Sequence, residues 1–218
     1  MPKLMLEVST SLDGFVAGPN PTLEHPLGEG GERLHEWALR LASWRASHGL
    51  PGGESDATDD GIVAESLAAT GAVVMGRRMF SGGAGAWEDD PRADGWWGDD
   101  PPFHVPVFIL THHAREPVSK RGGTTFTFIT DGIEAALEQA RAAAGDKDVL
   151  LAGGASVAQQ YLQAGLLEEL QIHIAPVLLG DGTHLFEQLG VEPIELEATR
   201  VVSSPAVTHL RFRVVRER

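Results

Sequence analysis

Residues 148–162 read Asp148-Val149-Leu150-Leu151-Ala152-Gly153-Gly154-Ala155-Ser156-Val157-Ala158-Gln159-Gln160-Tyr161-Leu162. An apolar run of strand length ends in two glycines, and a helical pattern follows with Val157, Tyr161 and Leu162 towards one side. Glycine lets a ligand approach the backbone closely, and the first turn of a helix offers unpaired N–H groups and a partial positive charge. The stretch therefore predicts a site for a pyrophosphate or another anion, and the alternative is a tight turn with no ligand.

A second signal of the same kind lies in Ala72-Val73-Val74-Met75-Gly76-Arg77-Arg78-Met79-Phe80. A short buried-strand pattern again meets a glycine, Gly76, and here Arg77 and Arg78 follow it. Guanidinium is a planar, permanently charged group that suits phosphate. This strand end is a candidate holder for a phosphate monoester, and the alternative is a solvated pair of arginines.

The composition limits the class of protein. The 218 residues hold 31 acidic and 17 basic side chains, for a formal net charge of -14, and no cysteine. Nucleic acid and anionic membranes are therefore unexpected partners, because both usually need a basic face. Disulfides, thiolate metal sites and a cysteine nucleophile are excluded.

No apolar stretch approaches the ~20 residues that span a bilayer. Glu7 interrupts the apolar run that begins at Leu4, so the N-terminal segment does not resemble a signal peptide. We expect a soluble, cytoplasmic protein.

Strand and helix patterns alternate along the chain. Strand-like segments cover residues 4–9, 72–75, 105–111, 124–130, 149–152, 170–178, 194–202 and 207–215. Helical patterns cover residues 32–47, 62–69, 131–144 (with Asp131 as the expected cap) and those after Gly154, whereas residues 82–102 have no periodicity. The order predicts an α/β fold: an open, mainly parallel sheet flanked by helices, with an antiparallel C-terminal hairpin at its edge. We expect one domain over residues 1–218.

The order of the motifs resembles that of a known family. It runs through Ser11-Leu12-Asp13-Gly14-Phe15-Val16-Ala17-Gly18, Val74-Met75-Gly76-Arg77-Arg78, Ile109-Leu110-Thr111, Leu151-Ala152-Gly153-Gly154, and Glu169-Leu170 followed by Ala175-Pro176-Val177-Leu178-Leu179-Gly180-Asp181-Gly182. The order resembles the dihydrofolate reductase superfamily, and most closely the reductase domain of riboflavin-pathway pyrimidine reductases and their stand-alone relatives. The resemblance covers nearly the whole chain.

The resemblance implies a dihydrofolate-reductase-like sheet with NADPH bound across the carboxyl ends of its strands, where ligands generally sit in open α/β sheets. Carried over by motif, the residues around the adenosine 2′-phosphate and adenine are Gly76, Arg77, Arg78, Thr111 and His112. Those that would cradle the pyrophosphate are Gly153, Gly154, Ala155, Ser156 and Val157. Those that would lie near the nicotinamide are Ser9, Phe15 and Val16.

Two departures from the family leave the substrate open. Ala152 stands where riboflavin-pathway reductases often carry an acidic residue, and a chain without cysteine cannot supply the usual ligands of their zinc deaminase domain. Dihydrofolate reductases place a carboxylate on the first helix and a threonine on a later strand. Here the helix offers Glu32 and Glu36, and the strand position corresponds to Ile172 or His173.

Two carboxylates are candidate catalytic groups. Glu36, next to Trp37, would protonate the substrate if its helix lines the cleft, and the alternative is a solvated helical face. Asp13 lies in a Leu-Asp-Gly turn, either as a turn-forming residue or as a polar group near the substrate. The histidines lack metal-ligand spacing, so we expect no metal.

The main hypothesis is an NADPH-dependent reductase that transfers a hydride to a C=N or C=O bond of a small heterocyclic, pteridine- or pyrimidine-like substrate. The alternatives are a non-catalytic, dimeric nucleotide-binding protein of the same fold and an enzyme that uses another reduced cofactor. We expect a homodimer through the C-terminal strands, where Leu210, Phe212 and Val214 alternate with polar residues at a sheet edge. The loop that carries Trp87, Trp96 and Trp97 is expected to close over the cleft or to pack against a second subunit.

Overall fold

The structure is a computed structural model that describes residues 2–83 and 85–215. Within this part of the chain a nine-stranded sheet has the order β10-β11-β8-β1-β7-β3-β4-β6-β5. Its strands are β1 (Leu4–Ser11), β3 (Thr70–Gly76), β4 (Pro106–Leu110), β5 (Val118–Ser119), β6 (Thr125–Ile129), β7 (Asp148–Gly153), β8 (Glu169–Ala175), β10 (Leu196–Ser203) and β11 (Thr208–Val214). A separate antiparallel pair joins β2 (Phe15–Ala17) to β9 (Thr183–His184).

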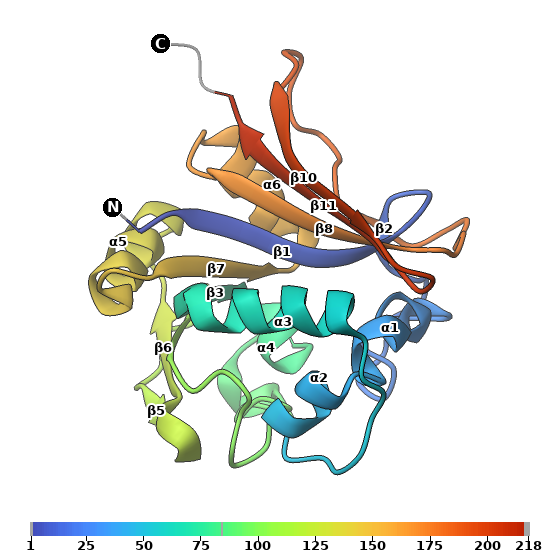
Figure 1. Ribbon diagram of the computed structural model, residues 1–218. Helices are drawn as coiled ribbons and strands as arrows, with labels where there is room; N and C mark the ends of the chain where they lie inside the picture. Colours follow the sequence, from blue (N-terminus) through green and yellow to red (C-terminus); the bar gives the residue numbers. More distant parts are fainter. Residues whose placement is uncertain (1, 84, 216–218) are drawn as a thin grey trace.

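The six central strands are parallel, and antiparallel strands close both edges. β8, β1, β7, β3, β4 and β6 pair in parallel. β11 and β10 continue the sheet antiparallel beyond β8, and β5 closes the other edge (Figure 1). The expected mainly parallel sheet with an antiparallel C-terminal hairpin is therefore confirmed.

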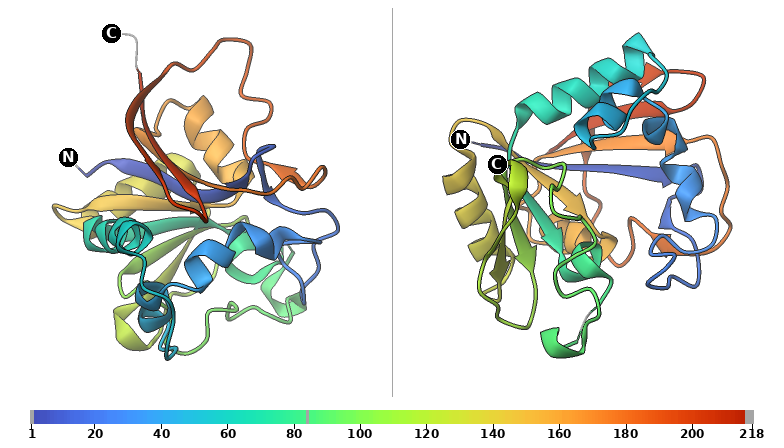
Figure 2. Two further views of the ribbon diagram at one scale, coloured as in Figure 1. Left: turned by 45° about the vertical axis from the view of Figure 1, so that its right-hand side comes forward. Right: turned by 90° about the horizontal axis from the view of Figure 1, so that it is seen from below.

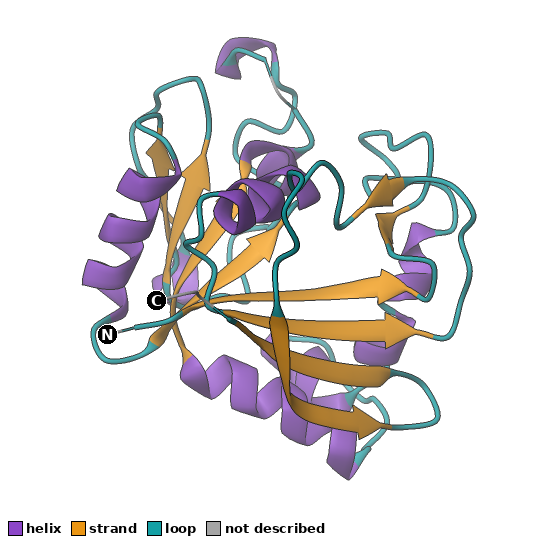
Figure 3. Cartoon of the chain, turned by 90° about the horizontal axis from the view of Figure 1, so that it is seen from above, coloured by secondary structure: helices purple, strands orange, loops and turns teal. Residues whose placement is uncertain are grey.

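Helices lie on both faces of the sheet (Figures 2 and 3). The helical elements are η1 (Gly31–Leu34), α1 (Glu36–Leu39), α2 (Ala42–Ser47), α3 (Ala57–Ala69), α4 (Arg77–Ser81), η2 (Trp87–Asp89), η3 (Arg121–Gly123), α5 (Ile133–Ala144) and α6 (Ala155–Gln163). On one face α5 and α6 pack against Leu6, Val74 and Leu151 in the largest apolar cluster. On the other face α4 covers β3, β4 and β6, whereas α3 and α1 cover β1, β8 and β11.

Three local predictions were wrong. The single helix expected over residues 32–47 is divided into η1, α1 and α2, because Leu41 takes an extended conformation before α2. Asp131 does not cap α5: the capping position belongs to Gly132, with no side-chain hydrogen bond. The alternating segment around Leu210 forms β11, which lies between β8 and β10, so the outermost strand is β10.

The tryptophan loop packs within the chain. Trp87 lies edge-on to Phe128 at 4.8 Å between ring centroids, and its indole N–H donates to the His113 carbonyl at 2.8 Å. Trp97 contacts Phe103 at 4.7 Å between centroids. These two side chains extend the apolar cluster on the α4 face of the sheet.

Candidate active site at the carboxyl edge of the sheet

Four predicted cofactor motifs meet at one edge of the sheet. β1, β7, β3 and β4 are neighbours and run parallel, so their carboxyl ends at Ser11, Gly153, Gly76 and Leu110 lie along the same edge. Segments far apart in the sequence are thus brought together where open α/β sheets generally bind ligands.

The first turn of α6 has the features of an anion site. Gly153 has a φ of +110°, which favours glycine, and the Gly153–Gly154 peptide bond is cis. Gly154 occupies the capping position with no side-chain hydrogen bond, and a side chain added there would meet open space. Ser156 is exposed, whereas Ala155 and Val157 are buried and anchor the helix. The N–H group of Val157 donates to the Gly154 carbonyl at 3.1 Å, whereas those of Ala155 and Ser156 have no acceptor among the described residues and are available to a negatively charged ligand.

Gly76 places the second motif against the first. A Cβ atom on Gly76 would lie 2.9 Å from Cγ2 of Val157 in α6, which is closer than real Cβ contacts allow. Glycine at this strand end therefore lets β3 approach the first turn of α6. The sulfur atom of Met79 in α4 would lie 3.9 Å from a Cβ atom added at Gly153, so α4 also reaches the end of β7.

The two arginines that follow Gly76 differ in environment. Arg77 is only 7% exposed, its Nη1 lies 2.5 Å from the carboxylate of Asp90, and its guanidinium lies 3.4 Å from the ring centroid of Trp87. Its Nε and Nη2 are buried, with no hydrogen-bond partner among the described residues. Arg78 is exposed. Arg77 thus has two buried N–H donors without an acceptor among the described residues, whereas the side chain of Arg78 is exposed to solvent.

Asp90 is the counter-ion of Arg77. Burial alone would raise the pKa of Asp90, but hydrogen bonds from Ser81, the Arg92 backbone and Arg77 together hold it below its usual value. The pair is therefore ionised and compact, and it fixes the guanidinium beside the carboxyl end of β3.

The remaining cofactor candidates lie on neighbouring strands. Thr111 is buried directly after β4 and its hydroxyl accepts from the His113 N–H, while His112 is exposed. Phe15 is buried and stacks on His184 at 3.9 Å between centroids, and Val16 packs against the apolar cluster beneath α6. The Ser9 hydroxyl accepts from the indole N–H of Trp37 at 3.0 Å.

Asp13 anchors a loop. Its carboxylate accepts from the backbone N–H groups of Leu179, at 3.1 Å, and Gly180, at 2.8 Å. A hydrogen bond from Ser11 and these backbone bonds lower the pKa of Asp13 to about 2. The carboxylate therefore links the turn after β1 to the segment that follows β8. This structural role matches the turn-forming alternative, although its partners are distant in the sequence.

Glu36 lies on the exposed side of α1. Its side chain is 65% exposed, and its nearest charged partner is Arg33 at 4.0 Å. The neighbouring Trp37, by contrast, lies on the buried side of α1 and faces the sheet. The structure thus places Trp37, not Glu36, on the inner side of the first helix.

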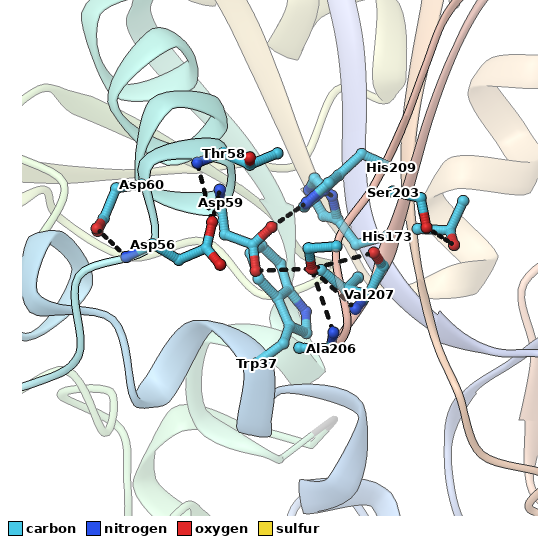
Figure 4. Close-up of polar contacts among 12 residues, drawn as sticks. Trp37, Asp56, Thr58, Asp59, Asp60, His173, Ser203, Ala206, Val207 and His209 are labelled. Atoms are coloured by element: carbon cyan, nitrogen blue, oxygen red, sulfur yellow. Dashed lines mark hydrogen bonds and ion pairs between the residues drawn. The ribbon is translucent and has the colours of Figure 1, made fainter.

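The sequence reasoning missed a buried polar chain on this face of the sheet. Glu7 (β1), His173 (β8), His209 (β11) and Asp59 (α3) are linked by hydrogen bonds of 3.0, 2.7 and 3.1 Å in that order. Figure 4 shows the two histidines and Asp59 of this chain of contacts. A sequence signal for it exists: polar residues alternate with apolar ones along strands that are otherwise buried. Gln171 and His173 in β8 are examples.

Burial shifts the titration of several of these groups. It lowers the pKa of His35, and the charge of His173 lowers it further. It also lowers the pKa of His209, although the hydrogen bond that His209 donates to Asp59 acts in the opposite direction. In Glu7 burial alone would raise the pKa, but the contacts with His173, Ser66 and Gln171 outweigh it and lower the pKa.

These directions predict acid sensitivity. Below the ordinary histidine pKa of 6.5 the unfolded chain takes up protons at His35 and His209, whereas the folded chain does so only at lower pH. The free energy of unfolding should therefore fall as the pH falls below about 6.5. Denaturant unfolding at a series of pH values measures this slope. It should become shallower in His35→Gln and stay unchanged in His112→Gln, whose histidine is exposed. A slope that is flat between neutral and mildly acidic pH would contradict the prediction.

Comparison with known proteins identifies the family. The model of the RibD C-terminal domain matches residues 2–210. The chain belongs to the RibD C-terminal domain family. The motif resemblance and the fold expected from it are both confirmed.

Solved structures agree with the RibD C-terminal domain assignment at the level of the fold. A putative riboflavin biosynthesis protein from Shewanella sp. PV-4 superposes with a TM-score of 0.64 and 20% identity, over 98% of this chain and 99% of that one. A pyrimidine reductase-like protein from Corynebacterium diphtheriae gives 0.54 and 15%, over 99% and 93%. RibD of Acinetobacter baumannii gives 0.57 and 17%, over 99% of this chain but 58% of its own.

One curated relative matches part of the chain. "Uncharacterized protein YyaP" of Bacillus subtilis (strain 168) is 32% identical over 92 residues, which are 40% of this chain and 48% of that protein. The match thus spans about half the length of this relative. Among the described residues, no helix has the length and apolar character needed to cross a membrane.

Proposed function

We propose that this chain is a reductase that uses NADPH and reduces a C=N or C=O bond of a small heterocyclic, pteridine- or pyrimidine-like compound. The observation that carries the proposal is the contact between the strand end at Gly76–Arg77 and the uncapped first turn of α6, in a chain of the RibD C-terminal domain family. The two motifs offer backbone N–H groups for a pyrophosphate and a guanidinium for a phosphate at one edge of the sheet.

The residues present fit such a cofactor. Arg77 keeps two buried N–H donors that no described residue accepts, and Gly154 faces open space at the first turn of α6. Gly153 to Val157 would hold the pyrophosphate, and Gly76, Arg77 and Arg78 the adenosine phosphate. Thr111 and His112 would lie beside the adenine. Ser9, Phe15 and Val16 would lie near the nicotinamide. When bound, the cofactor supplies the hydride, and the protein supplies position and exclusion of water.

The test joins binding to turnover. NADPH is titrated by calorimetry, and its oxidation is then followed with a panel of pteridines and aminopyrimidines. Oxidation that depends on both protein and substrate supports the reductase. Tight binding without oxidation of NADPH by any compound would favour a nucleotide-binding role, and no binding would overturn the proposal. Because Ala152 replaces the acidic residue expected before the paired glycines, the panel must extend beyond ribosylaminopyrimidines.

Glu36 and Asp13 remain the carboxylates proposed to assist protonation. If Glu36 serves as the acid, Glu36→Gln should lower turnover by roughly tenfold or more, because general acid catalysis typically contributes ~10²–10⁴ in rate. The NADPH affinity should not change, since the phosphate-holding motifs lie elsewhere. Glu32→Gln is the control, because Glu32 is a nearby glutamate whose side chain is also exposed. Equal turnover in Glu36→Gln and wild type would assign Glu36 to the surface.

We also propose that the chain acts as one domain and forms a homodimer through β10. β10 is the outermost strand, and Val201 on it is 64% exposed. Unpaired strand edges with apolar residues favour association with another strand. One chain has a mass of 23.3 kDa, and sedimentation velocity at micromolar concentration should give twice that mass. Val201→Lys should shift the particle to the monomer, whereas a monomer in the unchanged protein would refute the dimer.

A further inference from the structure

Polar residues form rows across three neighbouring strands beneath α3 and α1. Ser9 of β1 is in register with His173 of β8, and His173 is in register with His209 of β11. The next row joins Glu7 to Gln171 in the same way. A sheet face that is covered by helices normally carries apolar side chains, so this buried polar face needs an explanation.

The hydrogen bonds give each ring nitrogen of the two histidines one partner. In His173, Nε2 meets Glu7 at 3.0 Å and Nδ1 meets Nδ1 of His209 at 2.7 Å; Nε2 of His209 meets Asp59 at 3.1 Å. The side chains of His173, His209 and Asp59 are 4%, 3% and 0% exposed, and Glu7 is 16% exposed. Solvent therefore contributes little to this chain of contacts, which Figure 4 shows from Asp59 to the histidines.

The geometry fixes the number of protons. A carboxylate only accepts hydrogen bonds, so both Nε2 atoms must carry hydrogen. The contact between the two Nδ1 atoms needs one hydrogen: with none it joins two lone pairs, and with two it joins two N–H groups. Three hydrogens on four ring nitrogens make one imidazolium and one neutral imidazole.

The surroundings show which ring carries the charge. Glu7 accepts from Ser66 and Gln171 as well as from His173, as an ionised carboxylate does. Among the described residues, Asp59 accepts side-chain hydrogen bonds only from His209 and Ser204, one fewer than Glu7 accepts, and the ring of Trp37 lies nearer to His173 than to His209. His173 is thus the imidazolium, and it donates its Nδ1 hydrogen to a neutral His209.

Trp37 lies against this charged pair. Its ring centroid is 4.8 Å from that of His173 and 5.2 Å from that of His209. A cation within about 6 Å of an indole ring is attracted to it. The indole N–H of Trp37 in turn donates to the Ser9 hydroxyl. Trp37 therefore contacts the ring of His173 on one side and hydrogen-bonds Ser9, near the carboxyl end of β1, on the other.

We propose that His173 is a permanently protonated histidine in the interior, and that it acts as a positioning residue that holds Trp37 and Ser9 at the active site. The part that concerns the active site rests on the proposed function, and the protonation state does not. The titratable groups that face His173 are Glu7 from β1, His209 from β11, Asp59 from α3 through His209, and His35 from the segment before α1.

The protonation state is tested by NMR of protein labelled with ¹⁵N-histidine. We expect two ring N–H hydrogens on His173 and one on His209, unchanged between about pH 6 and pH 8 although an ordinary histidine titrates near 6.5. His173→Gln and His209→Gln assign the signals. His25→Gln is the control, because the side chain of His25 is 71% exposed and lies outside this chain of contacts. Two ring hydrogens in total on the pair, or independent titration of each ring, would overturn the proposal.

The positioning role is tested by the fluorescence of Trp37, obtained as the difference between each protein and its Trp37→Phe variant. A neighbouring imidazolium quenches indole emission, so the Trp37 signal should rise in His173→Gln and stay unchanged in His25→Gln. An unchanged signal in a folded His173→Gln would overturn this role. If that variant does not fold, the same comparison is made with Glu7→Gln, which removes the carboxylate that accepts from His173, and an unchanged Trp37 signal there would overturn the role. Neither measurement needs cofactor or substrate. A charged His173 in a protein that binds no NADPH would refute only the proposed function, and a neutral His173 in an active reductase would refute only this inference.

Discussion

Arg77→Ala is expected to weaken NADPH binding by roughly tenfold to a hundredfold and to leave NADH binding nearly unchanged. The reason is that a hydrogen bond to a charged group is worth ~1.5–3 kcal/mol, and only NADPH carries the adenosine 2′-phosphate. Nε and Nη2 of Arg77 are the donors that the described residues leave without an acceptor. Titration of both cofactors by calorimetry measures the two affinities.

The ion pair with Asp90 complicates this experiment. The Asp90 side chain is 2% exposed, so Arg77→Ala leaves a buried carboxylate without its counter-ion, which typically costs about 3–5 kcal/mol of stability. The double variant Arg77→Ala/Asp90→Asn removes the unpaired charge. It should regain much of the stability while the loss of NADPH affinity remains. A double variant that also regains NADPH affinity would show that Arg77 acts only through the fold.

Arg78→Ala separates the two arginines. Arg78 is exposed, and the variant should be as stable as the wild type. If it loses more NADPH affinity than the double variant does, the phosphate contact belongs to Arg78, and Arg77 is the structural member of the pair. Equal losses of NADPH and NADH in every variant would remove both residues from discrimination between the cofactors.

The sheet could be predicted because its signals are local. Strands such as Val149 to Leu151 are short apolar runs that end in glycine, and helices between them leave parallel pairing as the simple solution. The first helix could not be predicted in the same way. Its apolar spacing is regular, but Leu41 takes an extended conformation and is buried in a cluster with Trp37 and Val207. A periodic pattern does not show a break that tertiary packing imposes.

The candidate site shows the same limit at the level of side chains. Gly76 and Gly153 were found because glycine marks a required close approach whatever surrounds it. The orientation of a charged side chain depends on partners that the fold brings into reach. Arg77 turns towards Asp90, and Glu36 towards solvent, for reasons that no local pattern contains. Glu7 and His173 meet only because β1 and β8 pair in parallel, 166 residues apart in the chain.

Ser156→Glu is expected to weaken the binding of both cofactors by roughly tenfold or more without destabilising the protein, because each lost hydrogen bond to a charged group costs ~1.5–3 kcal/mol. Ser156 is exposed in the first turn of α6, where the backbone N–H groups would receive the pyrophosphate that NADPH and NADH share. A carboxylate there repels that group and competes for the same N–H donors.

The two effects of this substitution have opposite signs, which makes the test specific. A negative charge in the first turn of a helix is favourable by typically 0.3–1 kcal/mol. The melting temperature of Ser156→Glu should therefore stay level or rise while cofactor affinity falls, and a general loss of structure cannot produce that combination. Gln163→Glu is the control for affinity, because Gln163 is exposed at the last position of α6 and a charge there lies away from the first turn. Unchanged affinity in Ser156→Glu would move the pyrophosphate away from α6, and a loss for NADPH alone would place the 2′-phosphate there instead.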